Sequence, residues 1–223
     1  MSGRLSPART SVQYAVRKPL LDWLDAQDVR GLRVLDVGCG DRPYDALLAG
    51  AAEIVGFDRP GNRYADVHGS IDAIPVEDAS FDVVLCLQVL EHVPDPAAAV
   101  RELRRTVKDG GRVLLSTHGV YPFHPNPDDL WRWTHQGLEH LFRANGEWSS
   151  VTVRPGAGTA ATTAMLVAHA IDLLAKRAHL RPLGTPLVAL LNAAGEALDR
   201  AVPLLGEPVP GSLNANYHVE AVA

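Results

Sequence analysis

The feature that most constrains this chain is an apolar run that breaks into two closely spaced glycines. Residues 32–35 lead into Asp36, Gly38 and Gly40, and a helix can begin shortly afterwards. Glycine has no Cβ atom, so the backbone can turn sharply and a ligand can lie against it, while the free N–H groups of a following helix attract a carboxylate or a phosphate. Asp58 ends the next apolar run, 20 residues beyond Gly38, which is the interval at which a nucleotide-binding fold places an acid on ribose hydroxyls. The sequence therefore predicts a site for a ribose-bearing cofactor near the N-terminus.

Segments with strand and helix patterns alternate along the first half of the chain. Such alternation predicts an α/β fold, in which a parallel sheet has helices on both faces. We expect a single domain over residues 1–223, with an N-terminal helical segment at 11–28 that Pro19 kinks or splits, and a helical cap or insertion at 157–206 before the last strand. The expected strands are 33–37, 53–57, 64–67, 81–85, 112–116, 148–153 and 216–221, and the expected helices are 43–48, 95–107, 135–143, 159–177 and 186–200.

The composition argues against some classes of partner and location. A formal net charge of -5 gives no general attraction to nucleic acid. Cys39 and Cys86 are the only cysteines, and both read as small, reduced, buried residues, which fits a cytoplasmic protein. The N-terminus has no apolar signal core, and the apolar stretch 160–175 contains His169 and Asp172, so we expect no integral membrane segment.

Three motifs in the first half of the chain resemble those of one enzyme family. Residues 34–40 read VLDVGCG and look like the first motif of class I S-adenosylmethionine-dependent methyltransferases. Residues 81–84 (FDVV), then 89–96 (VLEHVPDP), together with the intervening 74–80 (IPVEDAS), are similar to the small-molecule branch often called type 11. Any one motif would be weak evidence, but three in the right order are a fairly specific signal, over roughly residues 30–120. The resemblance implies a Rossmann-like, seven-stranded, mostly parallel sheet whose last strand, 216–221, is antiparallel and lies beside 148–153.

The resemblance also implies the cofactor S-adenosyl-L-methionine, its product S-adenosyl-L-homocysteine, and the residues that contact them. The glycine loop would pack against the methionyl portion, with Asp36 near its ammonium group, and Asp58 would accept hydrogen bonds from the ribose diol. Taken alone, Asp58 can also be a helix cap. At the adenine, the type 11 pattern has an acid where this chain has Ser70, so Ser70, the Ile71 N–H and Asp72 are alternative partners. The predicted cofactor residues are Asp36, Gly38, Cys39, Gly40, Asp58, Arg59, Ser70, Ile71, Asp72, Leu87 and Gln88.

An aromatic, charged and proline-rich stretch at 121–134 follows the expected fifth strand. It emerges at the carboxyl edge of the sheet, where α/β proteins bind ligands, and its content suits a loop that covers a small-molecule substrate. Tyr121, Trp131 and Arg132 are the candidate substrate residues. The alternative is that the tryptophans anchor the loop and that Arg132 pairs with Asp128 or Asp129.

Methyl transfer from a sulfonium is an in-line displacement, and a hydroxyl or amine acceptor must also lose a proton. Histidine is the natural proton acceptor near neutral pH, so the candidate bases are His118, then His92 and His124. A metal set of His118, His124 and Asp128 is loosely spaced and of mixed ligand type, so no metal is predicted.

Three functions remain open from the sequence. The first is methyl transfer to a small-molecule O-, N- or C-nucleophile. The second is an NAD-dependent oxidoreductase, against which the loop lacks the third glycine needed for close helix packing. The third is a non-catalytic regulator or scaffold that binds the cofactor. The two late apolar helices are expected to form a cap or a homodimer surface.

Overall fold

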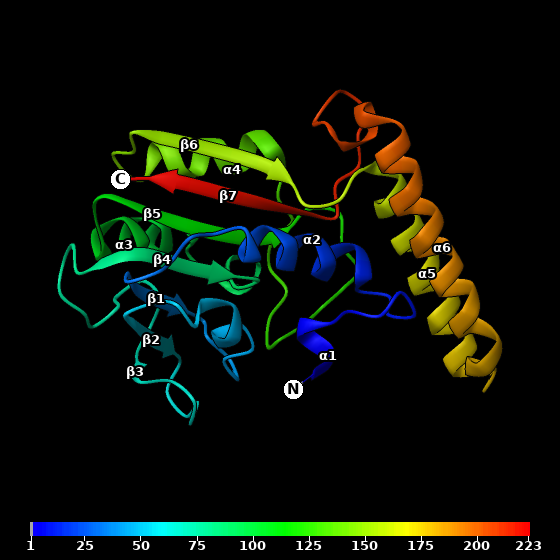
Figure 1. Ribbon diagram of the computed structural model, residues 1–223, viewed down its shortest axis with the longest axis horizontal. Helices are drawn as coiled ribbons and strands as arrows, with labels where there is room; N and C mark the ends of the chain where they lie inside the picture. Colours follow the sequence, from blue (N-terminus) through cyan, green and yellow to red (C-terminus); the bar gives the residue numbers. More distant parts are fainter. Residues whose placement is uncertain (1) are drawn as a thin grey trace. The chain divides into compact units, whose positions relative to one another are not determined.

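Within residues 2–223, which the computed structural model describes, the strands form one seven-stranded sheet in the order β3-β2-β1-β4-β5-β7-β6 (Figure 1). The pairs β1–β2, β1–β4, β2–β3 and β4–β5 are parallel. The predicted Rossmann-like sheet is confirmed. The strands are β1 (Arg33–Val37), β2 (Glu53–Asp58), β3 (Val67–His68), β4 (Phe81–Leu87), β5 (Val107–His118), β6 (Ser150–Pro155) and β7 (Asn216–Val222).

The last strand, β7, runs against its neighbours. Gly110 of β5 donates its N–H to the carbonyl of Ala223, whereas Gly119, which directly follows β5, donates to Ala215. The partner numbers therefore fall as the numbers along β5 rise. On the other side, Ser149 pairs with Val222 and Gly156 with Asn216 in the same falling order. A reversed final strand between β5 and β6 is the arrangement that the resemblance implies.

The helices begin where the sequence supplies a cap. Asp95 accepts a hydrogen bond from the Ala98 N–H, and Pro96 occupies the first helical position of α3. Thr134 caps α4 in the same way through the Gly137 N–H. The helices are α1 (Ser2–Leu5), α2 (Tyr14–Asp25), α3 (Pro96–Thr106), α4 (His135–Ala144), α5 (Thr159–Arg177) and α6 (Arg181–Ala201), with 3-10 turns η1 (Asp45–Leu48), η2 (Leu90–His92) and η3 (Pro203–Gly206).

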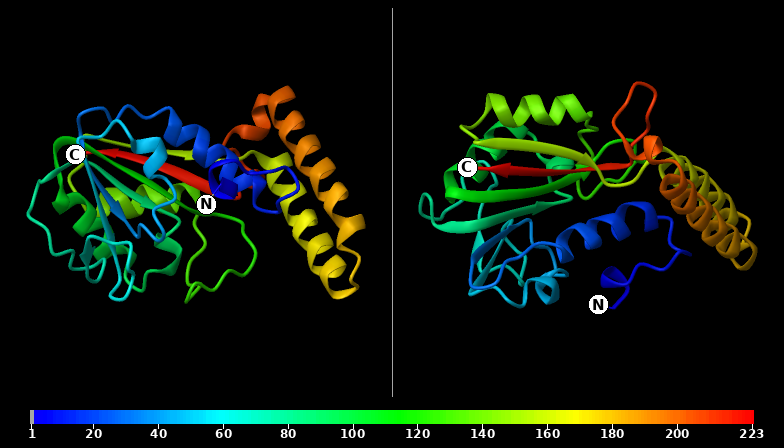
Figure 2. Two further views of the ribbon diagram at one scale, coloured as in Figure 1. Left: turned by 60° about the horizontal axis from the view of Figure 1, so that its bottom comes forward. Right: turned by 45° about the horizontal axis from the view of Figure 1, so that its top comes forward.

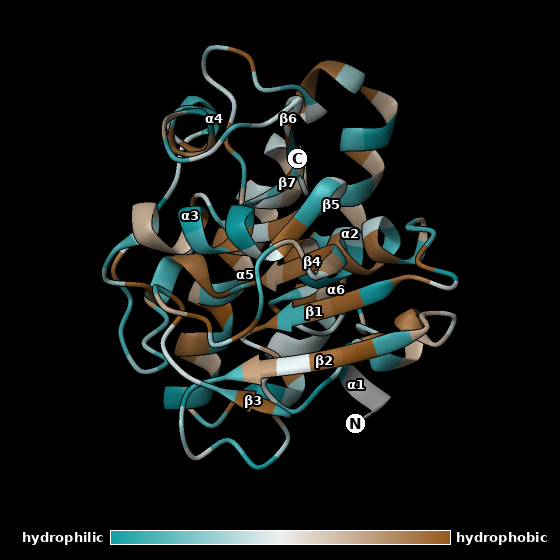
Figure 3. Cartoon of the chain, turned by 90° about the vertical axis from the view of Figure 1, so that its left-hand side faces the viewer, coloured by the Kyte–Doolittle hydropathy of each residue, from teal (hydrophilic) through white to brown (hydrophobic). Residues whose placement is uncertain are grey.

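The chain divides into two compact units. One unit comprises residues 25–118, 125–154 and 218–223 and holds most of the sheet. Its core is built on the central strands, whose hydrophobic stretches show as brown bands in Figure 3. Val34, Leu35, Val84 and Leu114 are fully buried there. Burial on both faces explains why these strands read as continuous apolar runs.

The other unit comprises residues 2–24, 119–124 and 155–217 and is dominated by the antiparallel helices α5 and α6, which run side by side (Figure 2). Small residues let the two backbones approach, because a Cβ atom on Gly195 would lie 2.8 Å from the Cα of Ala161. Asp199 of α6 accepts hydrogen bonds from the N–H groups of Ala160 and Ala161 and thereby caps α5. None of the helices within residues 2–223 is both long and apolar enough to cross a membrane.

Several expected boundaries are wrong, each for a physical reason. The helix expected at 43–48 is only the 3-10 turn η1, because the left-handed backbone of Arg42 and the following loop take up its start. The helix expected at 186–200 begins at Arg181, since packing of Gly184 against Ala175 continues the helix through Pro186. Pro19 lies inside the continuous helix α2, so the chain is not split there.

Candidate functional site

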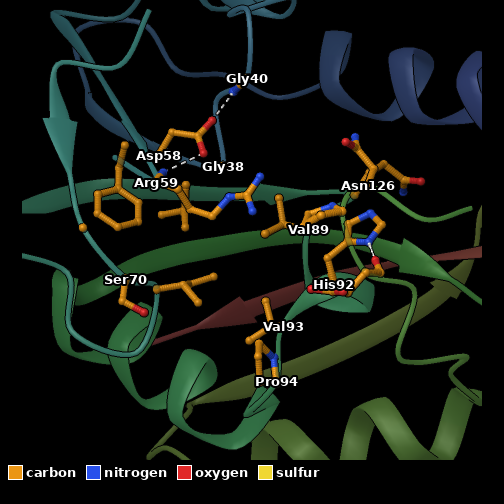
Figure 4. A pocket seen from close by; sticks show the side chains of 17 residues that line it. Gly38, Gly40, Asp58, Arg59, Ser70, Val89, His92, Val93, Pro94 and Asn126 are labelled. Atoms are coloured by element: carbon orange, nitrogen blue, oxygen red, sulfur yellow. Dashed lines mark hydrogen bonds between the residues drawn. The ribbon is translucent and has the colours of Figure 1, made fainter. Parts of the chain in front are cut away.

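A cavity of about 520 Å³ opens at the carboxyl ends of β1, β2 and β4, within the unit that holds most of the sheet (Figure 4). Its size is typical of small-molecule sites, and its position is where open α/β sheets bind ligands. The lining residues are Val37, Gly38, Gly40, Phe57, Asp58, Arg59, Gly69, Ser70, Ile71, Gln88, Val89, His92, Val93, Pro94, Asn126, Pro127 and Asp128. Seven predicted cofactor residues are among them, whereas Asp36, Cys39, Asp72 and Leu87 are not.

The two glycines of the loop serve different purposes. Gly38 has a φ of 75°, and a Cβ atom there would lie 2.3 Å from Val89 Cγ2, so this position must be glycine for packing. Gly40 has a φ of 56°, but a Cβ atom there would meet nothing within 4 Å. The N–H groups of Gly38 and Cys39 both donate to the carbonyl of Phe57. The loop therefore offers a ligand its open surface at Gly40 rather than a row of free amide groups.

Asp58 is held at the cavity by three hydrogen bonds within the protein. Its Oδ2 accepts from the N–H of Gly40 at 3.0 Å and from Asn62 Nδ2 at 2.7 Å, and its Oδ1 accepts from the Arg59 N–H at 2.7 Å. Figure 4 shows the contacts to Gly40 and Arg59. A carboxylate has about four acceptor positions, so two ribose hydroxyls can bind only if one of these partners moves. Asn62, which the sequence analysis missed, also donates to the Gly40 carbonyl and so ties the loop to this acid.

Asp36 lies buried beside the cavity without lining it. It is 2% exposed, and its Oδ2 has no hydrogen-bond partner. Burial, together with the nearby carboxylate of Asp45, raises the pKa of Asp36 to about 7. Burial also raises the pKa of the Cys39 thiol to about 12, which leaves that thiol unreactive near neutral pH.

Arg42 fixes the end of the glycine loop, and sequence analysis did not single it out. Its backbone is left-handed, with a φ of 55°. The guanidinium contacts Asp45 at 2.8 Å and Asp66 at 2.6 Å, and it donates to the carbonyl of Ile54. The Gly56 N–H and this guanidinium hold the pKa of Asp66 below its usual range. Arg42 therefore ties the loop to β2 through contacts that lie far apart in the sequence.

Gln88 forms the cavity wall at the end of β4. It has a φ of 58°, which is unusual for a residue with a Cβ atom. Its N–H donates to the Ser116 carbonyl at 2.8 Å, and its side-chain amide donates to Ser116 Oγ. Leu87, immediately before it, is buried in the sheet. The backbone turn thus directs Gln88, and not Leu87, to the cavity.

Glu91 is a buried acid that organises this end of the site. Its carbonyl accepts hydrogen bonds from the N–H groups of Leu130 and Trp131. In its side chain, Oε2 accepts from Thr117 Oγ1 at 2.9 Å, and Oε1 lies 3.2 Å from His118 Nε2 and 3.9 Å from His92 Nε2. Burial raises the pKa of Glu91. The acid therefore stands between two of the three candidate bases.

The three histidines differ in position. His92 lines the cavity, and its Nδ1 hydrogen-bonds to the carbonyl of Asp128 (Figure 4). His118 is buried and does not line the cavity. His124 belongs to the other unit, where its ring lies edge-on to Tyr121 with centroids 6.0 Å apart. Among the candidate bases, the structure brings only His92 to the cavity wall.

Trp131 and Arg132, two of the three substrate candidates, make contacts that anchor their loop. Trp131 Nε1 donates to the Val93 carbonyl at 2.8 Å, and the Trp131 and Trp133 rings stack with centroids 5.8 Å apart. Arg132 Nη1 lies 2.5 Å from Asp129 Oδ1. These contacts match the alternative interpretation of the sequence, in which the tryptophans anchor the loop and Arg132 pairs with a neighbouring acid. The same loop supplies Asn126, Pro127 and Asp128 to the cavity.

No group of histidine, cysteine or acidic side chains within the described part of the chain could hold a metal ion.

A second cavity of about 290 Å³ lies in the other unit, near Tyr14, Asn192 and Glu196. The carboxylate of Glu196 is already bound by Arg9, Tyr14 and Arg200. The larger cavity is therefore the better candidate for a site with a small-molecule ligand.

Comparison with known proteins assigns the family. The model of a methyltransferase domain matches residues 9–151. The chain therefore belongs to this methyltransferase family, and the resemblance to class I S-adenosylmethionine-dependent methyltransferases is confirmed. Its assignment to the type 11 branch stays a prediction.

A curated relative, the ubiquinone biosynthesis O-methyltransferase of Ralstonia nicotianae, is 40% identical in an alignment 114 positions long that covers 44% of this chain and 48% of the relative. The chain spans about half the length of the curated relatives it matches.

Solved structures share the fold at low identity. An S-adenosylmethionine-dependent methyltransferase from Mesorhizobium loti has a TM-score of 0.55 and 16% identity, covering 91% of this chain and 97% of that one. The [4+2]-cyclase SpnF has a TM-score of 0.57 and 20% identity, covering 93% and 82%. Because proteins with different activities share this fold, the site has to carry the argument for function.

Proposed function

We propose that the cavity at the ends of β1, β2 and β4 binds S-adenosyl-L-methionine and that the protein transfers its methyl group to a small-molecule acceptor. The observation that supports this most is the joint position of the open Gly40 surface and the Asp58 carboxylate on one cavity wall, in a chain of the methyltransferase family. A nucleoside with a ribose diol and a cationic amino-acid end complements these groups.

The residues present fit that cofactor. Asp36 has an unpartnered, buried carboxylate oxygen, which an ammonium group or a bridging water can satisfy. Asp58 would hold the ribose and Gly40 the methionyl portion. On the far side of the cavity mouth, Ser70 and Ile71 would meet the adenine, whereas Asp72 is exposed and outside the lining. When bound, the cofactor supplies an electrophilic methyl group on a sulfonium.

The chain's own residues would position the acceptor and take its proton. Holding two reacting groups in line can lower a barrier by roughly 7–11 kcal/mol. His92 donates Nδ1–H to the Asp128 carbonyl, which leaves Nε2 as the basic nitrogen. Glu91 holds His118 and lies near His92, so we assign His118 a positioning role rather than that of the base.

We further propose a hydroxyl acceptor. The Ralstonia relative is named as an O-methyltransferase, and a neutral hydroxyl needs the proton acceptor that His92 provides. Tyr121, Trp131 and Arg132 remain proposed substrate residues.

The test is transfer of labelled methyl groups from S-adenosylmethionine to a panel of phenols, alcohols and amines. His92→Ala should lower kcat by about 100-fold or more while changing the affinity for S-adenosylhomocysteine little. His124→Ala is the matched control and should retain turnover. Equal turnover in the His92 and His124 variants would refute the base assignment, and cofactor binding without transfer to any acceptor would favour a regulator or scaffold.

We retain three further proposals from the sequence. Residues 1–223 act as one methyltransferase domain with 157–206 as a helical cap, the location is cytoplasmic, and nucleic acid is not a partner. The sequence also predicts a homodimer through the late helices, and the vesicle experiment below compares this partner with another one.

A further inference from the structure

The tip of the α5–α6 hairpin has an unusual surface. Residues 173–183 are all exposed apart from Ala175. Leu173 is 68% exposed, Leu174 67% and Leu183 70%. Exposed leucines that occur singly need no explanation, but a contiguous group on one short segment marks a contact surface.

The apolar surface continues along α6 as a stripe. Leu183, Leu187, Leu190 and Leu198 are all exposed, and their spacing places them along one side of the helix. Another side of α6 is already covered, because Gly184 and Gly195 pack against α5. The stripe is therefore a second apolar side of α6 that no described residue covers.

The charge at the tip has a single sign. Lys176, Arg177 and Arg181 lie among the exposed leucines, and no carboxylate occurs between Asp172 and Glu196. Asp172 pairs with Lys176, which leaves the segment cationic in a protein whose net charge is -5. A partner that complements this tip must be both apolar and anionic.

We propose that the hairpin tip docks on an anionic lipid surface. Leucines can enter the boundary between headgroups and acyl chains, while the long lysine and arginine side chains keep their charges at the phosphates. Such a helix pair lies on the surface and does not need the length of a membrane span. A second copy of this chain fits less well, since a symmetric contact centred on the tip would bring like charges together.

The experiment is co-sedimentation of the full-length protein with vesicles. One set contains phosphatidylcholine and phosphatidylglycerol, and the other contains phosphatidylcholine alone. The protein should sediment with the anionic vesicles, less so as salt is raised. The variant K176Q/R177Q/R181Q should bind them about 100-fold more weakly, and L183S/L190S at least about tenfold more weakly.

Matched controls separate the tip from general properties of the protein. The variant R30Q/R143Q/R154Q removes three positive charges, as many as the tip variant, from exposed positions of the other unit. The variant L204S/F123S removes two exposed apolar side chains that lie outside the tip. Both should bind vesicles like the wild type. The proposal is overturned if the wild type prefers neither vesicle, if tip and control variants lose binding equally, or if the tip variants only convert a dimer to a monomer on gel filtration.

Discussion

The cavity and the hairpin tip depart from the usual distribution of polar and apolar groups in opposite ways. Beside the cavity, the carboxylate of Asp36 is buried with one oxygen unpartnered. At the tip, leucines such as Leu183 are exposed and flanked by cations. Each departure costs free energy in the isolated protein, so each indicates a partner that removes the cost. For Asp36 that partner carries positive charge, and for the tip it is apolar and anionic.

The comparison also shows how differently the two regions are constrained. The cavity wall is tied by Arg42, Asn62 and Glu91 through hydrogen bonds from several strands and loops. At the tip, Gly184 of α6 packs against Ala175 of α5, and backbone hydrogen bonds such as that from Leu180 to Ala175 close the turn. We therefore expect substitutions at the cavity to change binding and stability together, whereas those at the tip should change binding alone.

The largest expected effect concerns Asp58. Replacement by alanine removes a charged acceptor of two ribose hydroxyls and a partner of Gly40, so S-adenosylhomocysteine should bind about 100- to 1,000-fold more weakly. The measurement is the Kd by calorimetry. Asp72→Ala is the control, because Asp72 is exposed and outside the cavity lining, and its Kd should change less than about threefold. Equal losses in the two variants would contradict the assignment of Asp58.

Asp36→Asn tests whether the buried carboxyl is kept for a ligand rather than for stability. The pKa of Asp36 is about 7 in the folded chain and ordinarily near 4 in an unfolded one. The native state therefore gains a proton relative to the unfolded state between these values, and stability falls as the pH rises from about 4 to 7. Asn carries no charge, so the variant should gain about 2–3 kcal/mol over the wild type between pH 5 and pH 8 while losing affinity for the cofactor.

The measurement for Asp36 is the free energy of unfolding in urea at both pH values. Asp25→Asn, at an exposed position of α2, is the control and should show no such pH-dependent gain. If the free energies of unfolding of the wild type and of Asp36→Asn depend on pH in the same way, burial does not raise the pKa of this carboxyl.

A smaller effect on stability is expected at Gln88, where two variants separate the backbone conformation from the side-chain contact. Gly and Ala variants both lose the side-chain contact to Ser116, so their difference reports the left-handed backbone alone. Gln88→Gly should be more stable than Gln88→Ala by about 1 kcal/mol, the reverse of the usual order. Denaturant unfolding of the pair measures this, and an Ala variant that is equally stable would mean that the turn relaxes.

The smallest effect on the free energy of unfolding is expected at the tip. Leu183→Ser and Leu190→Ser remove exposed side chains, so the free energy of unfolding should change by less than about 0.5 kcal/mol. Val188→Ala, on the buried side of the same helix, should cost about 1–3 kcal/mol. A large loss from the serine variants would show that the exposed leucines stabilise the fold, which would remove the argument for an outside partner.

Much of the fold and part of the site could be predicted from sequence because their signals are local. The strand at β1, the loop glycines and Asp58 follow one another over a short stretch, and an acid at the end of a strand is placed by the strand itself. The reversed β7 is different, since only the family resemblance indicated it.

The missed features depend on contacts between distant positions. Asn62 donates to the Gly40 carbonyl across 22 positions of the chain, and Glu91 meets His118 across 27. Which histidine faces the cavity depends on burial, which a single sequence does not show for His118. The exposed leucines of α6 had helical spacing, but that pattern alone is more often a core face.

The central claim is that the cavity binds a sulfonium nucleoside through Asp58 and the glycine loop. Calorimetry of the wild-type protein with S-adenosylhomocysteine and with NAD tests it most directly. We predict saturable one-to-one binding of the first, lost in Asp58→Ala, and none of the second. Binding of NAD in place of S-adenosylhomocysteine, or affinity for S-adenosylhomocysteine that survives in Asp58→Ala, would contradict the account.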